Sequence, residues 1–389
     1  MDVLVVGAGP AGATLAGNLA EFGFKVTVVD KAQLPRFKPC SGGIPAKCRD
    51  LINLEDSVLD PLLEDVIHRV HLTYDHRDPV FIRSQRPLVY MVSRDRFDHA
   101  LIGDAARKGA RIVDGVEVLG VDPAGRRVRV RTTKGEMSAR VVVGADGVHS
   151  AVARSLGLSQ TEKLGLALQA ELHVSSNLLS EWRGVVGADF GRLPNGIGWV
   201  FPKSDHLSVG LLSFNRSKPW RRDDLFEFLN GQGLPFKPER VRVYSHYLPR
   251  WHGQRSFQHQ NVLLLGDAAG IVNPMTGAGL EAAMRSAQIA SEVIKHAFWH
   301  GDDLLVHYSD RIRREVCREL IDARAMAKLF FNFTRICYQL GIKNPSFSEI
   351  AARLLTGAID YTEVWKELAR AVFRRGDGVE MLRQDDPEG

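Results

Sequence analysis

The sequence lacks long apolar runs, paired cysteines and metal-ligand spacings. No stretch of about 18 apolar residues is present, so a membrane-spanning helix is not expected. The four cysteines, Cys40, Cys48, Cys317 and Cys337, form no C-x-x-C pair. Reduced thiols in a cytoplasmic setting, with no metal site, are therefore expected. The first residues already follow a strand pattern, which argues against a signal peptide.

The excess of one charge sign is also small. Lys and Arg number 51 against 46 Asp and Glu, which gives a net charge of +5 and a pI of about 9.0. A solvated surface is the simpler explanation, but the balance also favours an anionic partner such as a phosphorylated cofactor or an acidic lipid surface. No zinc-finger, homeodomain or ribonucleoprotein signature is present, so nucleic acid is not expected as a partner.

The N-terminus has the pattern of a βαβ unit. Residues 2–6 and 25–30 are valine-rich runs that predict buried parallel strands, and residues 10–22 carry the alanines and leucines of a helix. The first turn between them reads GAGPAG, which matches G-x-G-x-x-G in the required position between strand and helix. The unit therefore predicts a dinucleotide site, which could hold either NAD or FAD because both carry an ADP half.

The glycines and one acid of this unit have separate expected roles. Gly7 permits the tight turn, Gly9 lets the backbone approach a pyrophosphate, and Gly12 allows close packing of helix on strand. The helix N-terminus offers free N–H groups to the phosphates. Asp30, at the end of the second strand, can accept hydrogen bonds from an adenosine ribose.

Two later motifs favour FAD over NAD. The segment VVVGADGVHSAVAR carries Asp146 and Gly147, and GDAAGIVNPMTGAGLEAAMRSA carries Asp267 after an apolar strand. With the N-terminal fingerprint, these segments resemble the motifs of flavoproteins of the p-hydroxybenzoate hydroxylase type. The resemblance implies that Asp267 binds the ribityl chain. It also places the positive N-terminal end of the following helix at the flavin ring, where it would stabilise the reduced anion.

The resemblance implies a larger set of residues around FAD. Arg94, at a helix start, would contact the cofactor, although from the sequence alone it is equally a surface charge. Arg36 would lie on the adenine side. The whole expected FAD-binding set is Gly7, Gly9, Ala11, Gly12, Asp30, Lys31, Arg36, Ser41, Gly42, Arg94, Asp146, Gly147, Gly266, Asp267, Pro274, Gly277, Ala278 and Gly279.

Two further segments are similar to those of the geranylgeranyl reductase family. They are KPC followed by small residues at 38–43, and NGIGWVFPK at 195–203, in which Ile197 stands where a tyrosine is common. The resemblance implies that Cys40 is a catalytic residue beside the reacting alkene, although a buried small residue without a chemical part remains the alternative. Trp199, Phe201 and Pro202 would bind the isoprene units, with ordinary core packing as their alternative.

The activity implied is FAD-dependent saturation of carbon–carbon double bonds in a polyprenyl chain, carried by a lipid or a diphosphate. NADPH would supply hydride to the flavin and leave, because the chain has only one dinucleotide fingerprint; reduced ferredoxin could replace it. Reduced flavin would pass hydride to one alkene carbon while Cys40 or a bound water protonates the other. The prenyl substrate, the number of bonds reduced and the oligomeric state stay open.

Two rival functions follow from the same motifs. A hydroxylase or halogenase is possible because a fold does not fix a chemistry. Against halogenation, Ile197 replaces the first tryptophan of the W-x-W-x-I-P motif, and no lysine in a suitable context occurs near residues 60–80. The second rival is a flavin-holding regulatory or scaffold protein without turnover, which the complete set of cofactor motifs disfavours.

The expected fold is α/β, with a Rossmann-like FAD-binding domain, an inserted antiparallel-sheet substrate domain and a C-terminal helical region. Helical spacing of apolar residues over 326–340 predicts an amphipathic helix that packs on the core, lines a lipid cavity or makes peripheral contact with a membrane. The tail at 374–389 is polar and expected to be loose. The predicted limits are 1–60, 92–157 and 258–300 for the FAD domain, 61–91 and 158–257 for the sheet domain, and 301–389 for the helical region.

Overall fold

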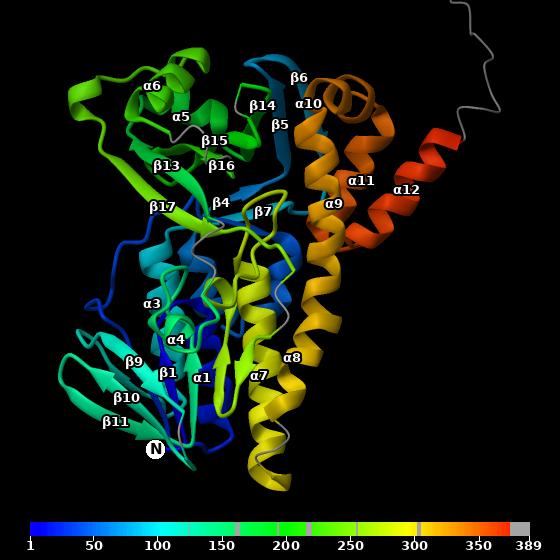
Figure 1. The fold of residues 1–389 in the computed structure, drawn as a ribbon. Helices are drawn as coiled ribbons and strands as arrows, with labels where there is room; N and C mark the ends of the chain where they lie inside the picture. Colours follow the sequence, from blue (N-terminus) through cyan, green and yellow to red (C-terminus); the bar gives the residue numbers. More distant parts are fainter. Residues whose placement is uncertain are drawn as a thin grey trace, which may run out of the picture.

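The architecture has an α/β layer, an antiparallel sheet above it, and helices along one side of both (Figure 1). This is the predicted fold class. The computed structural model describes residues 1–123, 125–159, 164–192, 194–214, 220–253, 256–301 and 305–373. The predicted loose tail at 374–389 lies outside the described residues.

The α/β layer is built on a six-stranded sheet with the order β18-β19-β12-β1-β2-β8, in which β18 alone is antiparallel to its neighbour. Its strands are β1 (Val3–Val6), β2 (Val26–Val29), β8 (Arg111–Val113), β12 (Val141–Gly144), β18 (Gln258–His259) and β19 (Val262–Leu264). The four residues of β1 are all buried, as expected for a parallel strand covered on both faces.

Helices and a small sheet cover this layer. Helix α1 (Pro10–Glu21) contacts both α3 (Arg94–Arg107) and α7 (Leu280–His300). An antiparallel sheet of β9 (Val118–Asp122), β10 (Val128–Thr132) and β11 (Gly135–Ala139) packs near β1 and the short α4 (Ala151–Ser155). Together these elements bury one continuous apolar core.

The second layer is a seven-stranded sheet with the order β17-β13-β16-β15-β14-β5-β6, antiparallel except for the pair β14–β5. Its strands are β5 (Arg69–Tyr74), β6 (Arg77–Arg83), β13 (Leu164–Leu172), β14 (Val185–Phe190), β15 (Gly196–Pro202), β16 (Leu207–Ser213) and β17 (Val243–Pro249). Helices α5 (Ser176–Trp182) and α6 (Arg222–Gly231) cover one face. The opposite face packs against the C-terminal helices.

A short three-stranded sheet lies between the two layers. It consists of β3 (Gly43–Pro45), β7 (Val89–Val92) and β4 (Leu63–Ile67), with the 3-10 turns η1 (Ala46–Leu51) and η2 (Asp60–Leu62) and helix α2 (Asp56–Leu59) beside it. Strands β5 and β6, which lie between β4 and β7 in the chain, belong instead to the seven-stranded sheet. The predicted segment 61–91 therefore contributes to both sheets, and the domain limits remain predictions.

The C-terminal region is helical and extends along both layers (Figure 1). It comprises α8 (His307–Ile312), the π-helical η6 (Arg313–Cys317), α9 (Arg318–Asn332), α10 (Thr334–Ile336), the π-helical η7 (Cys337–Ile342), α11 (Pro345–Thr356) and α12 (Tyr361–Phe373). Within the described part of the chain, no helix combines the length and apolar character that crossing a bilayer requires.

Candidate active site

The glycine fingerprint leaves one open position at the start of α1. Gly7 has φ +106°, and a Cβ on it would collide with the carbonyl oxygen of Ala145. A Cβ on Gly12 would collide with the carbonyl oxygen of Gly7. At Gly9 the nearest group to such a Cβ is the Arg36 Nη2, at 3.6 Å. Gly9 is also the N-cap of α1 with no side-chain cap, so the helix N-terminus is free to meet a phosphate.

Asp30 holds this loop in place. Its Oδ2 accepts a hydrogen bond from the Ala8 N–H at 2.8 Å, and its Oδ1 accepts one from Ala32 at 2.9 Å. The Arg36 Nε lies 3.8 Å from the same carboxylate. Each carboxylate oxygen keeps a lone pair for a further donor, so the predicted ribose contact is chemically available. Lys31 is exposed next to it.

The second motif meets the first through Asp146. Its Oδ2 accepts a hydrogen bond from Ala151 at 2.7 Å, while its Oδ1 is buried without a hydrogen-bond partner among the described residues. Burial raises the pKa of this carboxyl despite the backbone hydrogen bonds. A buried oxygen without a donor is costly, so Asp146 fits a position that awaits a ligand hydroxyl or water. Gly147, with φ +79°, faces open space.

The third motif also meets the first. A Cβ on Gly266 would lie 3.6 Å from the Ala11 Cβ, which shows how closely the two turns pack. The Asp267 side chain is partly buried and forms no hydrogen bond with a described residue. Gly279 caps the N-terminus of α7 without a side-chain bond, and a Cβ there would lie 3.0 Å from the Asp267 Oδ1. These free acceptor and donor groups fit the predicted ribityl and ring contacts.

The loop before α7 contacts the seven-stranded sheet. The Asn273 backbone closes it, accepting from Gly277 at 2.9 Å and donating to the Ala278 carbonyl at 3.0 Å. Pro274 inside this loop is buried. Gly277 has φ +74°, and a Cβ on it would collide with the Leu212 side chain of β16. The left-handed backbone at Gly277 favours glycine, and its contact with Leu212 marks where the loop approaches the seven-stranded sheet.

The Cys40–Gly43 turn packs against the end of β15. Gly42 has φ +76°, and a Cβ on it would collide with both the Val92 carbonyl oxygen and the Lys203 Nζ. A Cβ on Gly43 would lie 2.8 Å from the Phe201 ring. Ser41, which precedes these glycines, is partly buried. The structure therefore brings together the two segments that resemble geranylgeranyl reductases, and it explains both glycines by close approach.

The Cys40 thiol lies in a positive environment. Burial by itself would raise its pKa, but the charge of Arg94, the Gly42 N–H at 3.4 Å and the charge of Lys203 together lower it. Arg94 is partly buried and fixed by Asp98, with Nε–Oδ1 2.8 Å and Nη2–Oδ2 3.0 Å. Arg94 is thus no ordinary surface charge. The arrangement makes Cys40 a stronger acid than a free thiol.

Selective alkylation tests this environment. Burial raises the pKa of Cys48 and Cys317 to about 12, and it raises that of Cys337 as well. At neutral pH we expect iodoacetamide to modify Cys40 at least about tenfold faster than the other three, because only thiolates react. Peptide mass spectrometry measures the rates. Lys203→Met should slow labelling of Cys40. Equal labelling rates at Cys40 and Cys337 would contradict a lowered pKa of the Cys40 thiol.

Lys203 and Glu64 form a buried pair that sequence reasoning missed. The Lys203 Nζ donates to the Val92 carbonyl at 2.5 Å and lies 3.7 Å from the Glu64 Oε2. Burial lowers the pKa of Lys203 even though Glu64 raises it. Lys203 belongs to the quoted FPK segment, so a signal existed for it. No sequence motif marks Glu64, which lies in β4, far from that segment in the chain.

His246 is the second residue that the sequence did not single out. It lies on β17 and is influenced by charges from Lys38, Asp267, Arg94 and His149. Burial lowers its pKa first, and the charges of Lys38 and Arg94 lower it further. The edge strand β17 of the seven-stranded sheet therefore lies near His149 of the second motif and Asp267 of the third.

The predicted substrate residues divide between the two faces of β15. Trp199 and Phe201 alternate with Pro202, so Pro202 points to the other face and is buried there. Phe201 and Ile197 pack with the apolar cluster beneath the C-terminal helices. The Trp199 Nε1 is buried without a hydrogen-bond partner among the described residues. The site thus has an apolar wall on the Phe201 face, and Pro202 could meet a substrate only through its backbone.

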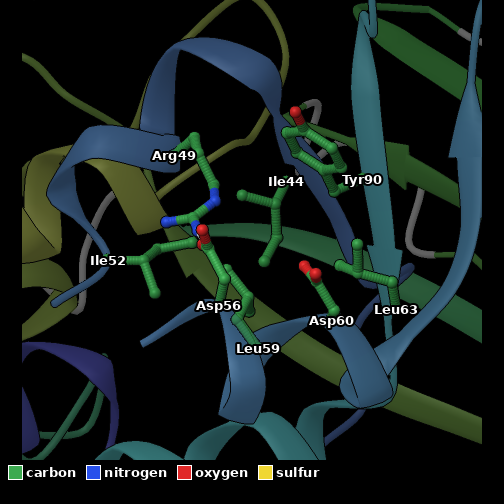
Figure 2. A pocket seen from close by; sticks show the side chains of 8 residues that line it. All are labelled: Ile44, Arg49, Ile52, Asp56, Leu59, Asp60, Leu63 and Tyr90. Atoms are coloured by element: carbon green, nitrogen blue, oxygen red, sulfur yellow. The ribbon is translucent and has the colours of Figure 1, made fainter. Parts of the chain in front are cut away.

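A separate cavity of about 230 Å³ lies on the outer side of the small sheet. Figure 2 shows its lining, in which Arg49 reaches toward Asp56 from η1, and Tyr90 closes one side. Drug-sized ligands usually occupy about 300–1,000 Å³, so this cavity is too small for a dinucleotide. None of the residues that line it belongs to the three cofactor motifs.

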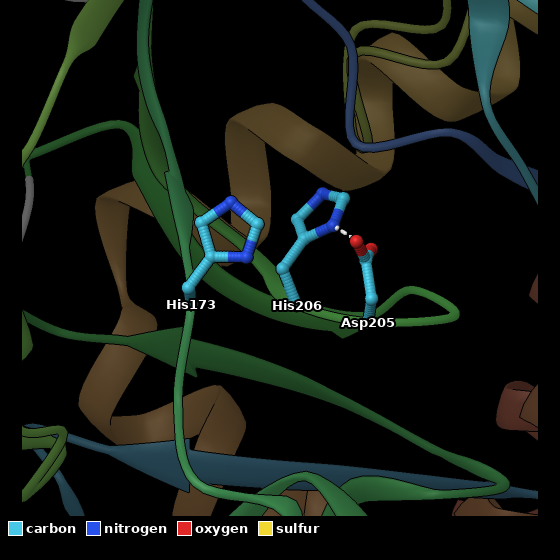
Figure 3. A group of neighbouring side chains, drawn as sticks. All are labelled: His173, Asp205 and His206. Atoms are coloured by element: carbon cyan, nitrogen blue, oxygen red, sulfur yellow. Dashed lines mark hydrogen bonds and ion pairs between the residues drawn. The ribbon is translucent and has the colours of Figure 1, made fainter.

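His173, Asp205 and His206 form a group whose ligand atoms lie within 4.8 Å of one another (Figure 3). Both His206 ring nitrogens already face carboxylates, Glu171 at 2.6 Å and Asp205 at 2.6 Å. Burial lowers the pKa of His206, but these two carboxylates raise it more. His206 is thus paired with Glu171 and Asp205, His173 contacts its ring, and a metal would have to displace one of these two pairs.

Comparison with known proteins identifies the class. A family model described as an FAD binding domain matches residues 1–324. A digeranylgeranylglycerophospholipid reductase from Methanothrix thermoacetophila is 30% identical over 345 residues, covering 82% of this chain and 84% of that protein. A chloroplastic geranylgeranyl diphosphate reductase from Nicotiana tabacum is 28% identical over 314 residues, covering 76% of this chain and 66% of that protein. These matches define an FAD-dependent oxidoreductase.

Solved structures agree on the fold. A geranylgeranyl bacteriochlorophyll reductase-like protein from Thermoplasma acidophilum has a TM-score of 0.73 at 22% identity, covering 95% of this chain and 98% of that one. The halogenase PltM shares the fold, with a TM-score of 0.69 at 18% identity, covering 97% and 84%. The chain belongs to the geranylgeranyl reductase family of FAD-dependent oxidoreductases.

Proposed function

We propose that the protein saturates carbon–carbon double bonds of a geranylgeranyl-type chain carried by a lipid or a diphosphate. The observation that carries this proposal is the contact of the Cys40–Gly43 turn with Phe201 and Lys203, beside the three cofactor motifs. Relatives named as reductases of digeranylgeranylglycerophospholipid and of geranylgeranyl diphosphate support it. When bound, FAD supplies the hydride, which it receives from NADPH or, alternatively, from reduced ferredoxin.

The residues around Cys40 suit the protonation of the alkene, which accompanies hydride transfer in this reaction. An isolated alkene is a poor hydride acceptor, so an acid must protonate one carbon as hydride reaches the other. General acids act best when their pKa lies near the working pH, and they contribute about 10²–10⁴-fold. Arg94 and Lys203 shift the Cys40 thiol in that direction. The apolar wall that contains Phe201 would hold the isoprene units and exclude water.

Lipid analysis of a heterologous host tests the proposal. Expression should add two hydrogens for each double bond saturated in the host's prenyl lipids, which mass spectrometry resolves. Unchanged prenyl chains together with an oxygenated product would instead establish a hydroxylase. The electron donor is assigned separately, by mixing the FAD-loaded protein anaerobically with NADPH or with reduced ferredoxin and following the loss of flavin absorbance.

A further inference from the structure

Large exposed apolar side chains gather on one C-terminal segment. Of the twelve found among the described residues, five lie between positions 321 and 340. Their exposed fractions are 59% for Ile321, 47% for Leu329, 53% for Phe333, 56% for Ile336 and 69% for Leu340. Ile321 and Leu329 lie on α9, Phe333 at the residue that ends it, and Ile336 and Leu340 on the following α10 and η7. We call this set the apolar stripe of α9–η7.

Positive charge accompanies the apolar stripe. Arg318, Arg324, Lys328 and Arg335 are exposed in the same segment, and none forms an ion pair with a described residue. The two acids of residues 318–343 are both engaged elsewhere. Glu319 lies 3.0 Å from the Lys47 Nζ, and Asp322 accepts a hydrogen bond from the Thr362 hydroxyl at 2.6 Å. The outer side therefore presents unpaired cations beside apolar groups.

The inner side of the same segment reaches the candidate active site. Phe330 and Tyr338 are buried in the apolar cluster that also contains Phe201 and Ile197. The Tyr338 hydroxyl lies 2.9 Å from the Leu72 carbonyl oxygen of β5, which anchors η7 to the seven-stranded sheet. Figure 1 shows α9 running along the side of both layers. One segment thus has the apolar wall on one side and the apolar stripe on the other.

We propose that the apolar stripe of α9–η7 docks on the surface of an anionic lipid bilayer. Apolar side chains enter the headgroup boundary and neighbouring Lys and Arg meet anionic lipid, which is the pattern of an interfacial helix. A protein partner is less suitable, because residues 318–343 carry four unpaired exposed cations and no exposed acid, and the neighbouring exposed Asp78 is already paired with Lys343, which suits a uniformly negative surface. The bilayer would be the source of the prenyl lipid, and that part of the proposal rests on the proposed function.

Vesicle sedimentation tests the docking without any prenyl substrate. FAD-loaded protein is mixed with vesicles of phosphatidylglycerol and phosphatidylcholine in equal parts, and with phosphatidylcholine alone. Binding should favour the anionic vesicles and weaken with salt. Ile336→Ser combined with Leu340→Ser should lower binding by about tenfold or more, because two apolar anchors are lost. The matched control, Leu119→Ser combined with Trp299→Ser, also removes two exposed apolar side chains but should bind as the wild type does.

Three results would overturn the proposal. The first is that the wild type does not bind anionic vesicles, and the second is that both double variants lose the same amount of binding. The third is that sedimentation velocity detects self-association of the wild type, which the Ile336→Ser and Leu340→Ser double variant abolishes. Retained FAD and circular dichroism show that a variant is folded. Vesicle binding by a protein that leaves prenyl chains unchanged would refute the proposed function and not the docking surface. Prenyl reduction in detergent by a protein that does not bind vesicles would refute the docking surface and not the proposed function.

Discussion

Replacement of Cys40 by alanine should slow alkene reduction by about 10²–10⁴-fold, the usual contribution of a positioned general acid. FAD binding should persist, since the thiol accepts one weak hydrogen bond within its own turn, from the Gly42 N–H at 3.4 Å, and Asp98 still holds Arg94 in place. The assay uses FAD-loaded protein, reduced anaerobically with dithionite, and follows the return of oxidised flavin absorbance on addition of a prenyl lipid. Cys337→Ala is the matched control, because Cys337 is also partly exposed but its pKa is raised.

The pH profile adds an independent check on Cys40. An acid must hold its proton to deliver it, so the rate should fall as pH rises through the pKa of the thiol. Because that pKa is lowered, the fall should occur at lower pH than the value of about 8.5 for a free cysteine would give. Lys203→Met removes one lowering charge and should move the fall to higher pH. A Cys40→Ala rate within about threefold of the wild type would contradict an acid role.

Replacement of Asp30 by alanine should weaken FAD binding by about tenfold to 150-fold. The carboxylate fixes the fingerprint loop through Ala8 and Ala32, and we propose that it also binds the ribose. Hydrogen bonds to charged groups contribute about 1.5–3 kcal/mol, which converts to that range. Titration of the apoprotein with FAD, followed by quenching of flavin fluorescence, measures the affinity.

Asp50→Ala is the matched control for this measurement, since Asp50 is an exposed aspartate of the neighbouring turn η1. It should leave the affinity unchanged. If Asp30→Ala retained the wild-type affinity within about twofold while remaining folded, the proposed ribose contact would be wrong. Thermal unfolding of the two apoproteins separates a loss of stability from a loss of cofactor contacts.

The N-terminal half of the site could be predicted because its determinants are local. Gly12 and Asp30 act within one βαβ unit, where a few residues of sequence specify a turn, a helix start and a strand end. Gly7 belongs to the same motif, but its close approach to the Ala145 carbonyl depends on tertiary packing. The long helices and the valine-rich strands could also be predicted, from the spacing of apolar residues along the chain. The pairing of Arg94 with Asp98 also follows from the i,i+4 spacing on a helix.

The surroundings of Cys40 could not be predicted in the same way. Lys203 follows the end of β15, Glu64 lies on β4 and His246 lies on β17, and only tertiary packing brings these side chains near the turn or the cofactor motifs. The small sheet that positions Gly43 is made of strands of three to five residues, whose pairing has no signature in sequence. Amphipathicity predicts one helix over 326–340, whereas in the structure α9 ends at Asn332 and the chain continues through α10 and the π-helical η7. Only the exposed fractions show that Leu329, Phe333 and Leu340 face solvent while Phe330 is buried in the core.

The most direct test of the central claim is the stoichiometry of a single anaerobic turnover. FAD-loaded wild-type protein, reduced with dithionite and freed of excess reductant, is mixed with a geranylgeranyl-chain lipid in the absence of oxygen. The account predicts that oxidised flavin returns and that mass spectrometry finds one double bond saturated for each flavin reoxidised. A flavin that stays reduced until air is admitted, with the lipid unchanged or oxygenated, would contradict it.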